Sequence, residues 1–248
     1  MKAFNENFNQ NIDRFLSINY LNLANLIDTY GGVDVDITRA ERNALNAMVS
    51  TKKDSIQKMA DMGAIEQILV EALVREYYLD GWGEQTHLNG LQAVGFGWLQ
   101  YDSVYNCCLR EVKVISDLFD SVGSAINNQV IFYTNQDGVP NATDDRKVIN
   151  LDAPTAEDVE FLYKLVSPIF DKSYNNLEKE EIIQISLTFG RAAYMASKQG
   201  VNVFQNVVVD ILPLEANNPY DKIAGTEGHI VDYEANAAAI TEFLYGED

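Results

Sequence analysis

The spacing of hydrophobic residues predicts that helices and strands alternate in the first part of the chain. Over Phe4–Ile37 the pattern predicts a helix, a strand, a second helix and a second strand. Apolar residues at helical spacing over Leu21–Ile27 indicate the second helix, and Gly31 and Gly32 end it because glycine tolerates a positive φ. Val33–Ile37 alternates hydrophobic and acidic residues with period two, as a half-buried strand does.

Apolar residues at helical spacing also predict several helices in the middle of the chain. Thr38 is a typical N-cap for a helix that is expected to run to Met48, and Asp54–Tyr78 predicts a second long helix. Asp80–Gly83 then predicts a loop. Another helix is expected over Tyr105–Ser121. Its expected buried stripe consists of Leu109, Val112, Ile115, Leu118 and Phe119.

Towards the C-terminus, polar stretches alternate with periodic apolar runs. Asn127–Leu151 is polar and rich in turn residues, which predicts a surface excursion, and Thr155 begins a helix to about Val166. The other expected elements are a helix over Leu177–Met195, a β-rich run over Val201–Leu212, a loop over Tyr220–Val231 and a last helix ending near Gly246. This mixture predicts a layered α/β fold, in which a central mixed sheet has helices packed on both faces.

Composition and charge restrict the class of protein. An apolar fraction of 47% excludes a disordered chain, and a net charge of −19 disfavours nucleic-acid partners because both surfaces are negative. The two cysteines, Cys107 and Cys108, are adjacent and form neither a disulfide framework nor a metal-binding spacing. No apolar run reaches the ~20 residues of a membrane span and no signal peptide opens the sequence, which predicts a cytoplasmic protein if the sequence is complete.

The stretch His87–Val114 is the most informative part of the chain for function. It contains a turn at Leu88-Asn89-Gly90, a short helix, an aromatic and glycine-rich segment, and the start of a longer helix. This order resembles the LytR-CpsA-Psr (LCP) family of bacterial envelope proteins, which carries L-N-G-x-Q-A-L-x-Y-A-R-x-R-Y followed by R-T-x-R-Q. The residues that match this pattern outright are Asn89, Gly90, Gln92, Ala93 and Tyr101.

The arginines of the family pattern are mostly replaced. Trp98 and Gln100 stand where the resemblance places two paired arginines, and Cys107 stands at the first arginine of the second motif. Arg110 is retained, and Glu111 takes the place of a glutamine. These five positions are the expected substrate-binding positions. Because they match the family's phosphate-binding positions, Trp98, Gln100 and Arg110 are expected to converge on one side of the sheet, at the mouth of a pocket. Trp98 fills the space of the lost arginine or, as an alternative, stacks on a sugar.

The resemblance reaches both ends of the chain. Ile12–Ile37 is similar to the family's run that ends in G-G-V-x-V-x-[IV], and the last helix is similar to its F-[IL]-Y-G ending. The resemblance therefore implies one LCP-like domain over residues 1–248, with insertions or excursions at 38–85 and 125–155. The family's upstream S-x-P-R-D strand, which supplies a catalytic acid and a phosphate-binding arginine, has no match, so the domain is expected to be truncated at its N-terminus.

The resemblance implies a function in which polyprenyl-diphosphate carriers donate phosphoglycans to peptidoglycan outside the membrane. Clustered arginines would hold the diphosphate, with Mg²⁺ nearby. Because most of these arginines are absent, we expect an inactive transferase with no catalytic residue, no cofactor and no recognisable Mg²⁺ site.

Two alternatives remain open at this point. The chain could be a non-catalytic scaffold that binds a polyprenyl lipid, a cell-wall glycopolymer or a partner protein, or it could be completed by a separate N-terminal polypeptide. The large side chains near Trp98 also predict that the family's lipid channel is narrowed there.

Overall fold

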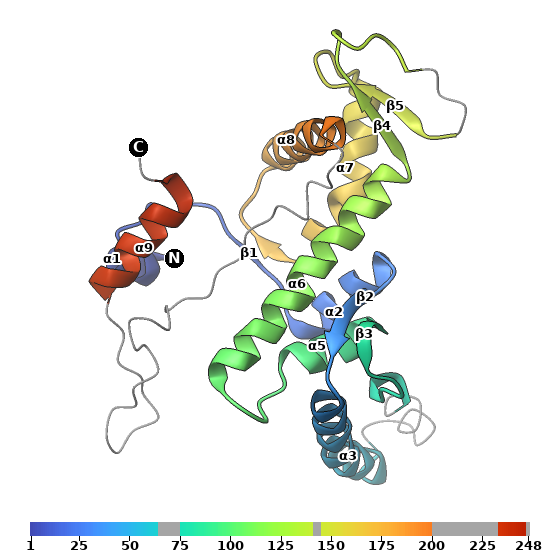
Figure 1. Ribbon diagram of the computed structural model, residues 1–248, viewed down its shortest axis with the longest axis vertical. Helices are drawn as coiled ribbons and strands as arrows, with labels where there is room; N and C mark the ends of the chain where they lie inside the picture. Colours follow the sequence, from blue (N-terminus) through green and yellow to red (C-terminus); the bar gives the residue numbers. More distant parts are fainter. Residues whose placement is uncertain (64–74, 141–144, 200–232, 247–248) are drawn as a thin grey trace. The chain divides into compact units, whose positions relative to one another are not determined.

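A computed structural model describes residues 1–63, 75–140, 145–199 and 233–246 (Figure 1). The chain divides into two compact units, one formed by residues 1–16 with 209–248 and the other by residues 17–208. The single domain over residues 1–248 that the sequence suggests stays a prediction.

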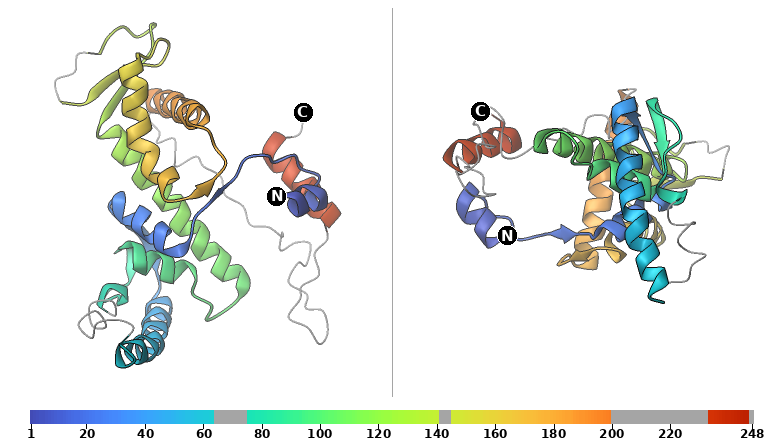
Figure 2. Two further views of the ribbon diagram at one scale, coloured as in Figure 1. Left: turned by 180° about the vertical axis from the view of Figure 1, so that it is seen from behind. Right: turned by 90° about the horizontal axis from the view of Figure 1, so that it is seen from below.

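The smaller unit is built from two helices, α1 (Lys2–Phe8) and α9 (Tyr233–Tyr245). The helices lie side by side, and the Phe8 ring meets the Tyr233 ring edge-on at 5.6 Å between centroids (Figure 2). Asn236 and Ile240 of α9 are buried. The predicted first and last helices are therefore confirmed.

The larger unit begins with the predicted alternation of helix and strand. β1 (Leu16–Ser17) lies at the boundary of the two units and is followed by α2 (Tyr20–Thr29) and β2 (Val33–Ile37). Gly31 and Gly32 have φ values of 92° and 89°, and the Gly32 N–H donates to the carbonyl of Ile27, which closes the end of α2.

β2 pairs antiparallel with β3 (Gly83–Leu88). Along β2 the valines and the isoleucine are buried while Asp34 and Asp36 are exposed, so the predicted two-residue period is confirmed. Asp34 also forms a cross-strand pair with His87, at 2.9 Å between Oδ1 and Nδ1. Both carboxylates thus lie on the solvated face of the strand.

α3 (Arg39–Asp61) begins at the predicted cap but is longer than expected. The Thr38 hydroxyl accepts the Glu41 N–H, and the Glu41 carboxylate accepts the Thr38 N–H, which completes a capping box. The predicted break between Met48 and Asp54 is wrong, because no glycine or proline interrupts the helix there. Residues 64–74 of the predicted second helix lie outside the described residues.

α5 (Gly90–Gly97) and α6 (Val104–Asn127) follow the central turn. The N-caps are Asn89, which forms a capping box with Gln92, and Ser103, which accepts the Asn106 N–H. α6 extends past the expected end. Its buried residues are Cys107, Arg110, Val114, Leu118, Val122 and Gly123.

The buried stripe of α6 therefore differs from the predicted one. Leu109 and Phe119 were expected to be buried, but both are exposed. The helix is rotated because Arg110, a charged residue that hydrophobic spacing excludes from a core, occupies the stripe.

The remaining elements of the larger unit are β4 (Val130–Tyr133), β5 (Lys147–Asn150), α7 (Ala156–Asp171), β6 (Tyr174–Asn175) and α8 (Lys179–Lys198). β4 and β5 pair in parallel and bury Val130 and Ile149 against α7 and α8. The predicted surface excursion over Asn127–Leu151 missed these two strands, because each is only four residues long. Thr155 caps α7 with Asp158 as predicted.

The mixed α/β class predicted from the sequence is confirmed, but its strands are arranged differently. Within the described residues the strands pair in twos instead of joining one central mixed sheet. Long helices separate the pairs along the chain, and the core forms one cluster around β2, β3, α2 and α5 and a second around β4, α7 and α8. The predicted β-rich run Val201–Leu212 and the loop Tyr220–Val231 lie outside the described residues. Of the helices that the structure describes, none combines the length and the apolar character needed to span a membrane.

Candidate functional site

The turn between α5 and α6 carries the sequence-predicted site, and two glycines bring it against its neighbours (Figure 1). A Cβ on Gly90 would lie 1.9 Å from the carbonyl oxygen of Ala24, so α5 touches the backbone of α2. A Cβ on Gly97 would lie 3.5 Å from the Cγ of Glu111, so the other end of α5 packs on α6. The site is thus held by close helix contacts.

Arg110 is buried in a cage of acceptors. It is 2% exposed, and its Nη2 lies 2.8 Å from Asp102 Oδ1 while its Nη1 lies 3.1 Å from Asp102 Oδ2. Glu41 adds a second carboxylate at 3.6 Å, and the guanidinium carbon lies 5.2 Å from the centroid of the Tyr101 ring. Arg110 Nη2 also donates to the Leu99 carbonyl. The one motif arginine that the sequence retains is therefore already neutralised by the protein's own carboxylates.

The ionisation of these groups follows from the same contacts. Hydrogen bonds from Arg110 lower the pKa of Asp102 to about 2, so this carboxylate is charged at neutral pH. Burial opposes the charged form of Arg110, but the hydrogen bond that Arg110 donates to the Asp102 carboxylate outweighs it and raises the pKa of the guanidinium. Burial raises the pKa of Tyr101, and the nearby Glu41 carboxylate raises it further. The cage therefore holds one cation between two anions.

The other four sequence-predicted positions have different environments. Trp98 is 50% exposed and stacks on Tyr20, with 4.4 Å between ring centroids and 22° between ring planes. Gln100 is exposed. Cys107 is buried with its Sγ 3.4 Å from the Gly97 carbonyl, and burial raises the pKa of the Cys107 thiol, which disfavours a nucleophilic thiolate. Glu111 is exposed, and partial desolvation raises the pKa of its carboxyl group.

A cavity of about 240 Å³ brings two of these positions together. Trp98 and Glu111 line it, whereas Gln100 and Arg110 do not. The predicted convergence of Trp98, Gln100 and Arg110 at one pocket is therefore wrong for Gln100 and Arg110. The charge of Arg110 is held by Asp102 and Glu41 instead. The other residues that line the cavity are Tyr20, Leu23, Ala93, Val94, Gly97, Val114 and Ile115.

Sequence reasoning missed three residues that define this region. Asp102 and Glu41 neutralise Arg110, and Tyr20 stacks on Trp98. Asp102 precedes Arg110 by eight residues, which is not a helical neighbour spacing, and Glu41 and Tyr20 are remote in sequence. The predicted N-cap at Thr38 puts Glu41 in the first turn of a helix. Nothing in the local sequence pattern indicates that Glu41 pairs with Arg110.

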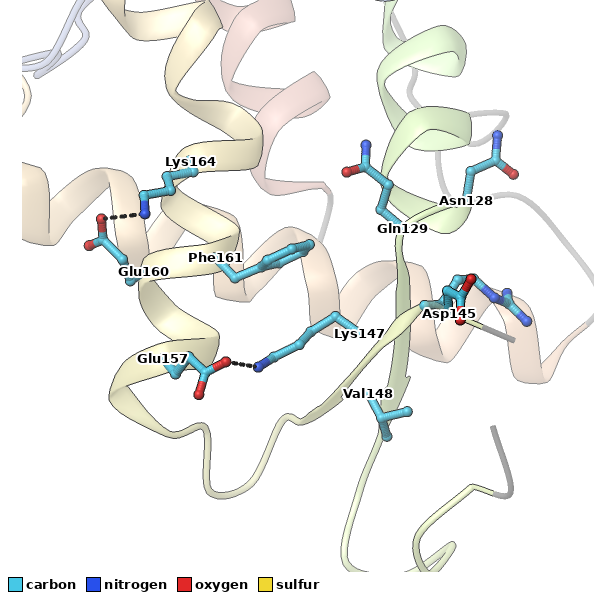
Figure 3. A pocket seen from close by; sticks show the side chains of 10 residues that line it. Asn128, Gln129, Asp145, Lys147, Val148, Glu157, Glu160, Phe161 and Lys164 are labelled. Carbon is cyan, nitrogen blue, oxygen red and sulfur yellow. Dashed lines mark hydrogen bonds and ion pairs between the residues drawn. The ribbon is translucent and has the colours of Figure 1, made fainter. Parts of the chain in front are cut away.

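A second, larger cavity of about 1010 Å³ lies beside β5 and α7 (Figure 3). Its lysines face glutamates: Lys147 Nζ lies 2.8 Å from Glu157, and Lys164 Nζ lies 3.7 Å from Glu160. The Phe161 side chain points between these two pairs. None of the five sequence-predicted positions lines this cavity. Its charges compensate one another, so it offers no concentrated site for an anion.

The family resemblance implies Mg²⁺, which binds to carboxylates together with water and phosphate oxygens. Nowhere in residues 1–63, 75–140, 145–199 and 233–246 do three or more His, Cys, Asp or Glu side chains group so that they could hold a metal ion. Asp102, which precedes α6, accepts hydrogen bonds from Arg110 and from the Asn106 side chain, at 2.8 Å and 3.0 Å.

Comparison with known proteins agrees with the sequence pattern. The model of the LytR_cpsA_psr family matches residues 1–104. Over these residues the chain is similar to the LCP family. The match includes the run Ile12–Ile37 and the first motif, and it ends before Cys107, Arg110 and Glu111.

The fold is similar to that of an LCP protein of known structure, B. subtilis TagV. The two share 10% sequence identity with a TM-score of 0.51, over 99% of this chain and 69% of TagV. Protein gbs0355 from Streptococcus agalactiae is also similar, with 16% identity and a TM-score of 0.37 over 73% of this chain and 45% of that protein. No curated protein sequence matches the chain.

Proposed function

We propose that the chain is an LCP-type protein of the cell envelope whose phosphoglycan transferase site is inactive. The observation that supports this most directly is the cage around Arg110. A diphosphate carries several negative charges and requires several fixed cations. Here Trp98 and Gln100 bring no charge, and the charge of Arg110 is matched by Asp102 and Glu41.

The energetics oppose binding of a diphosphate at this position. To reach a phosphate, the Arg110 guanidinium would have to leave the buried Glu41 carboxylate as well as the more exposed Asp102, and breaking a buried pair costs about 3–5 kcal/mol. The incoming phosphates would also approach a chain with a net charge of −19. Loss of a single arginine that stabilises phosphoryl transfer lowers the rate of that reaction by ~10³–10⁵. A site in which the remaining arginine is neutralised is therefore expected to catalyse no measurable transfer.

A turnover assay tests the proposal. The purified chain is incubated with a polyprenyl diphosphate and Mg²⁺, and phosphate release is followed beside an active transferase. We expect no release above that of buffer. Release at a rate typical of enzymes, and lost in the Arg110→Lys variant, would contradict the proposal, because it would show that Arg110 still serves a reaction.

The alternative of a non-catalytic scaffold has two forms, and we prefer the one that binds a partner. An apolar cavity among α6, α7, α8 and β4 has a volume of about 80 Å³. A cavity of this volume offers little room for a polyprenyl chain, which consists of many isoprene units. The half-exposed Tyr20–Trp98 pair, by contrast, offers a surface to a partner.

The lipid form of the alternative has its own test. We expect an organic extract of the native purified protein to contain no polyprenyl lipid, since the apolar cavity is nearly filled by side chains such as Phe132 and Phe170. Mass spectrometry of the extract measures this, with an extract of the unfolded protein as the recovery control. Lipid recovered in proportion to protein would reverse the preference and support a lipid-binding scaffold.

A further inference from the structure

The cavity beside Trp98 combines three chemical features. Its floor is aliphatic and includes Leu23, Val94 and Ile115. One wall is the stacked pair of Tyr20 and Trp98, which are 49% and 50% exposed. The carboxylate of Glu111 is its only fully charged lining group.

Glu111 has no cationic partner in the part of the chain that the structure describes. Arg110, its neighbour on α6, is held by Asp102 and Glu41 instead. The Glu111 stem packs against the backbone of Gly97, where a Cβ would lie 3.5 Å from Cγ. A partly desolvated carboxylate beside apolar side chains is stabilised by a cation of opposite charge.

The aromatic pair adds attraction for the same kind of ligand. The face of a tryptophan attracts an ammonium group electrostatically, and tryptophan does so better than the other aromatic residues. The chain's net charge of −19 raises the local concentration of cations and speeds their encounter. A sugar would need several hydrogen-bonding groups, whereas this cavity offers mainly aliphatic surface.

We infer that this cavity binds a primary alkylammonium group, in the form of a lysine side chain presented by a partner peptide. The four methylenes of a lysine suit the floor of Leu23, Val94 and Ile115, and its ammonium group suits Glu111 and the Trp98 ring. The cavity volume of about 240 Å³ accommodates such a side chain. The inference goes beyond the proposed loss of transferase activity, which stands even if no amine binds.

Titration of the whole chain with N-acetyl-lysine methylamide tests the inference, with N-acetyl-norleucine methylamide as the uncharged ligand of similar shape. Fluorescence of Trp98 reports binding in a Trp82→Phe background, because Trp82 and Trp98 are the chain's two tryptophans. We expect weak, millimolar binding of the lysine ligand and affinity for norleucine that is lower by about fivefold, the value of one solvent-exposed charge pair.

Three variants distinguish binding in the cavity from a general attraction of cations by the protein's negative charge. Glu111→Gln should weaken the lysine ligand by about fivefold and leave norleucine unchanged. Glu84→Gln removes the same charge from an exposed position on β3 outside the cavity and should have no effect. Trp98→Ala, read by NMR, should weaken the lysine ligand by about fivefold to tenfold.

Three outcomes would overturn the inference. They are equal binding of lysine and norleucine, equal weakening by Glu111→Gln and Glu84→Gln, and no binding of the lysine ligand at all. Circular dichroism of each variant checks that it is folded, so that a lost signal reports the cavity. The turnover assay tests only the proposed loss of transferase activity, and the titrations test only the binding of lysine. Either proposal can therefore be contradicted while the other stands.

Discussion

Replacing Arg110 by methionine is expected to lower the free energy of unfolding by about 3–5 kcal/mol. Methionine keeps much of the side chain's volume but removes the charge that Asp102 and Glu41 share. Glu41 is itself 8% exposed, so its carboxylate would remain in a buried site without its cation. Urea unfolding followed by circular dichroism measures the loss.

Two further variants isolate the ion pairs as the cause. Lys113→Met removes a cation from an exposed position of the same helix and should change the free energy of unfolding by less than about 0.5 kcal/mol. Adding Glu41→Gln and Asp102→Asn to Arg110→Met should restore part of the stability, since no unpaired charge then remains. A loss below 1 kcal/mol in Arg110→Met, as for a surface pair, would contradict the buried cage.

Acid should remove part of the same stabilisation. The pKa of Asp102 is lowered to about 2 in the folded protein, whereas an unfolded aspartate titrates near 3.9. Because the folded value is the lower one, the contribution of Asp102 is present above about pH 4 and is lost as the pH falls towards 2. The difference between the original chain and Arg110→Met should therefore shrink over this range.

The sequence predicted the local elements well where a cap or a turn residue marked them. Thr38, Asn89 and Thr155 each begin a helix through a capping box, and Gly31 and Gly32 adopt the positive φ that ends α2. These features depend on neighbours within four residues, so the chain reveals them without tertiary information. Strand pairing was less accessible, because β4 and β5 are short and are stabilised by burial against α7 and α8.

The candidate site was only partly predictable for a related reason. The motif located Trp98 and Glu111, which do share a cavity, but it suggested that Arg110 points to the same place. The direction of Arg110 depends on Glu41, which is remote in sequence, and on the Asp102 carboxylate beyond the α6 N-cap. The sequence can reveal that a charged residue lies among the apolar residues on the buried face of a helix. The residues with which it pairs are determined by tertiary packing.

The contact between α2 and α5 gives the second large prediction, because Gly90→Ala should destabilise the protein by about 3 kcal/mol or more. A Cβ there would lie 1.9 Å from the carbonyl oxygen of Ala24 and 2.5 Å from its carbonyl carbon. These are backbone atoms of the buried Ala24, so no side chain can rotate away to relieve the overlap. The Gly90 N–H also donates to Asp28 at 2.7 Å, and separating the helices would strain this bond.

Gly97→Ala is the matched control, since it adds the same methyl group to the same helix. Its Cβ would meet Glu111 Cγ at 3.5 Å, an ordinary contact, and alanine favours the helix by up to about 1 kcal/mol. Thermal unfolding of both variants should therefore show a large decrease in Tm for Gly90→Ala and little change or a small increase for Gly97→Ala. If both variants unfold at the same temperature as the original chain, α2 and α5 do not approach as closely as the structure places them, and the position of Trp98 over Tyr20 loses its support.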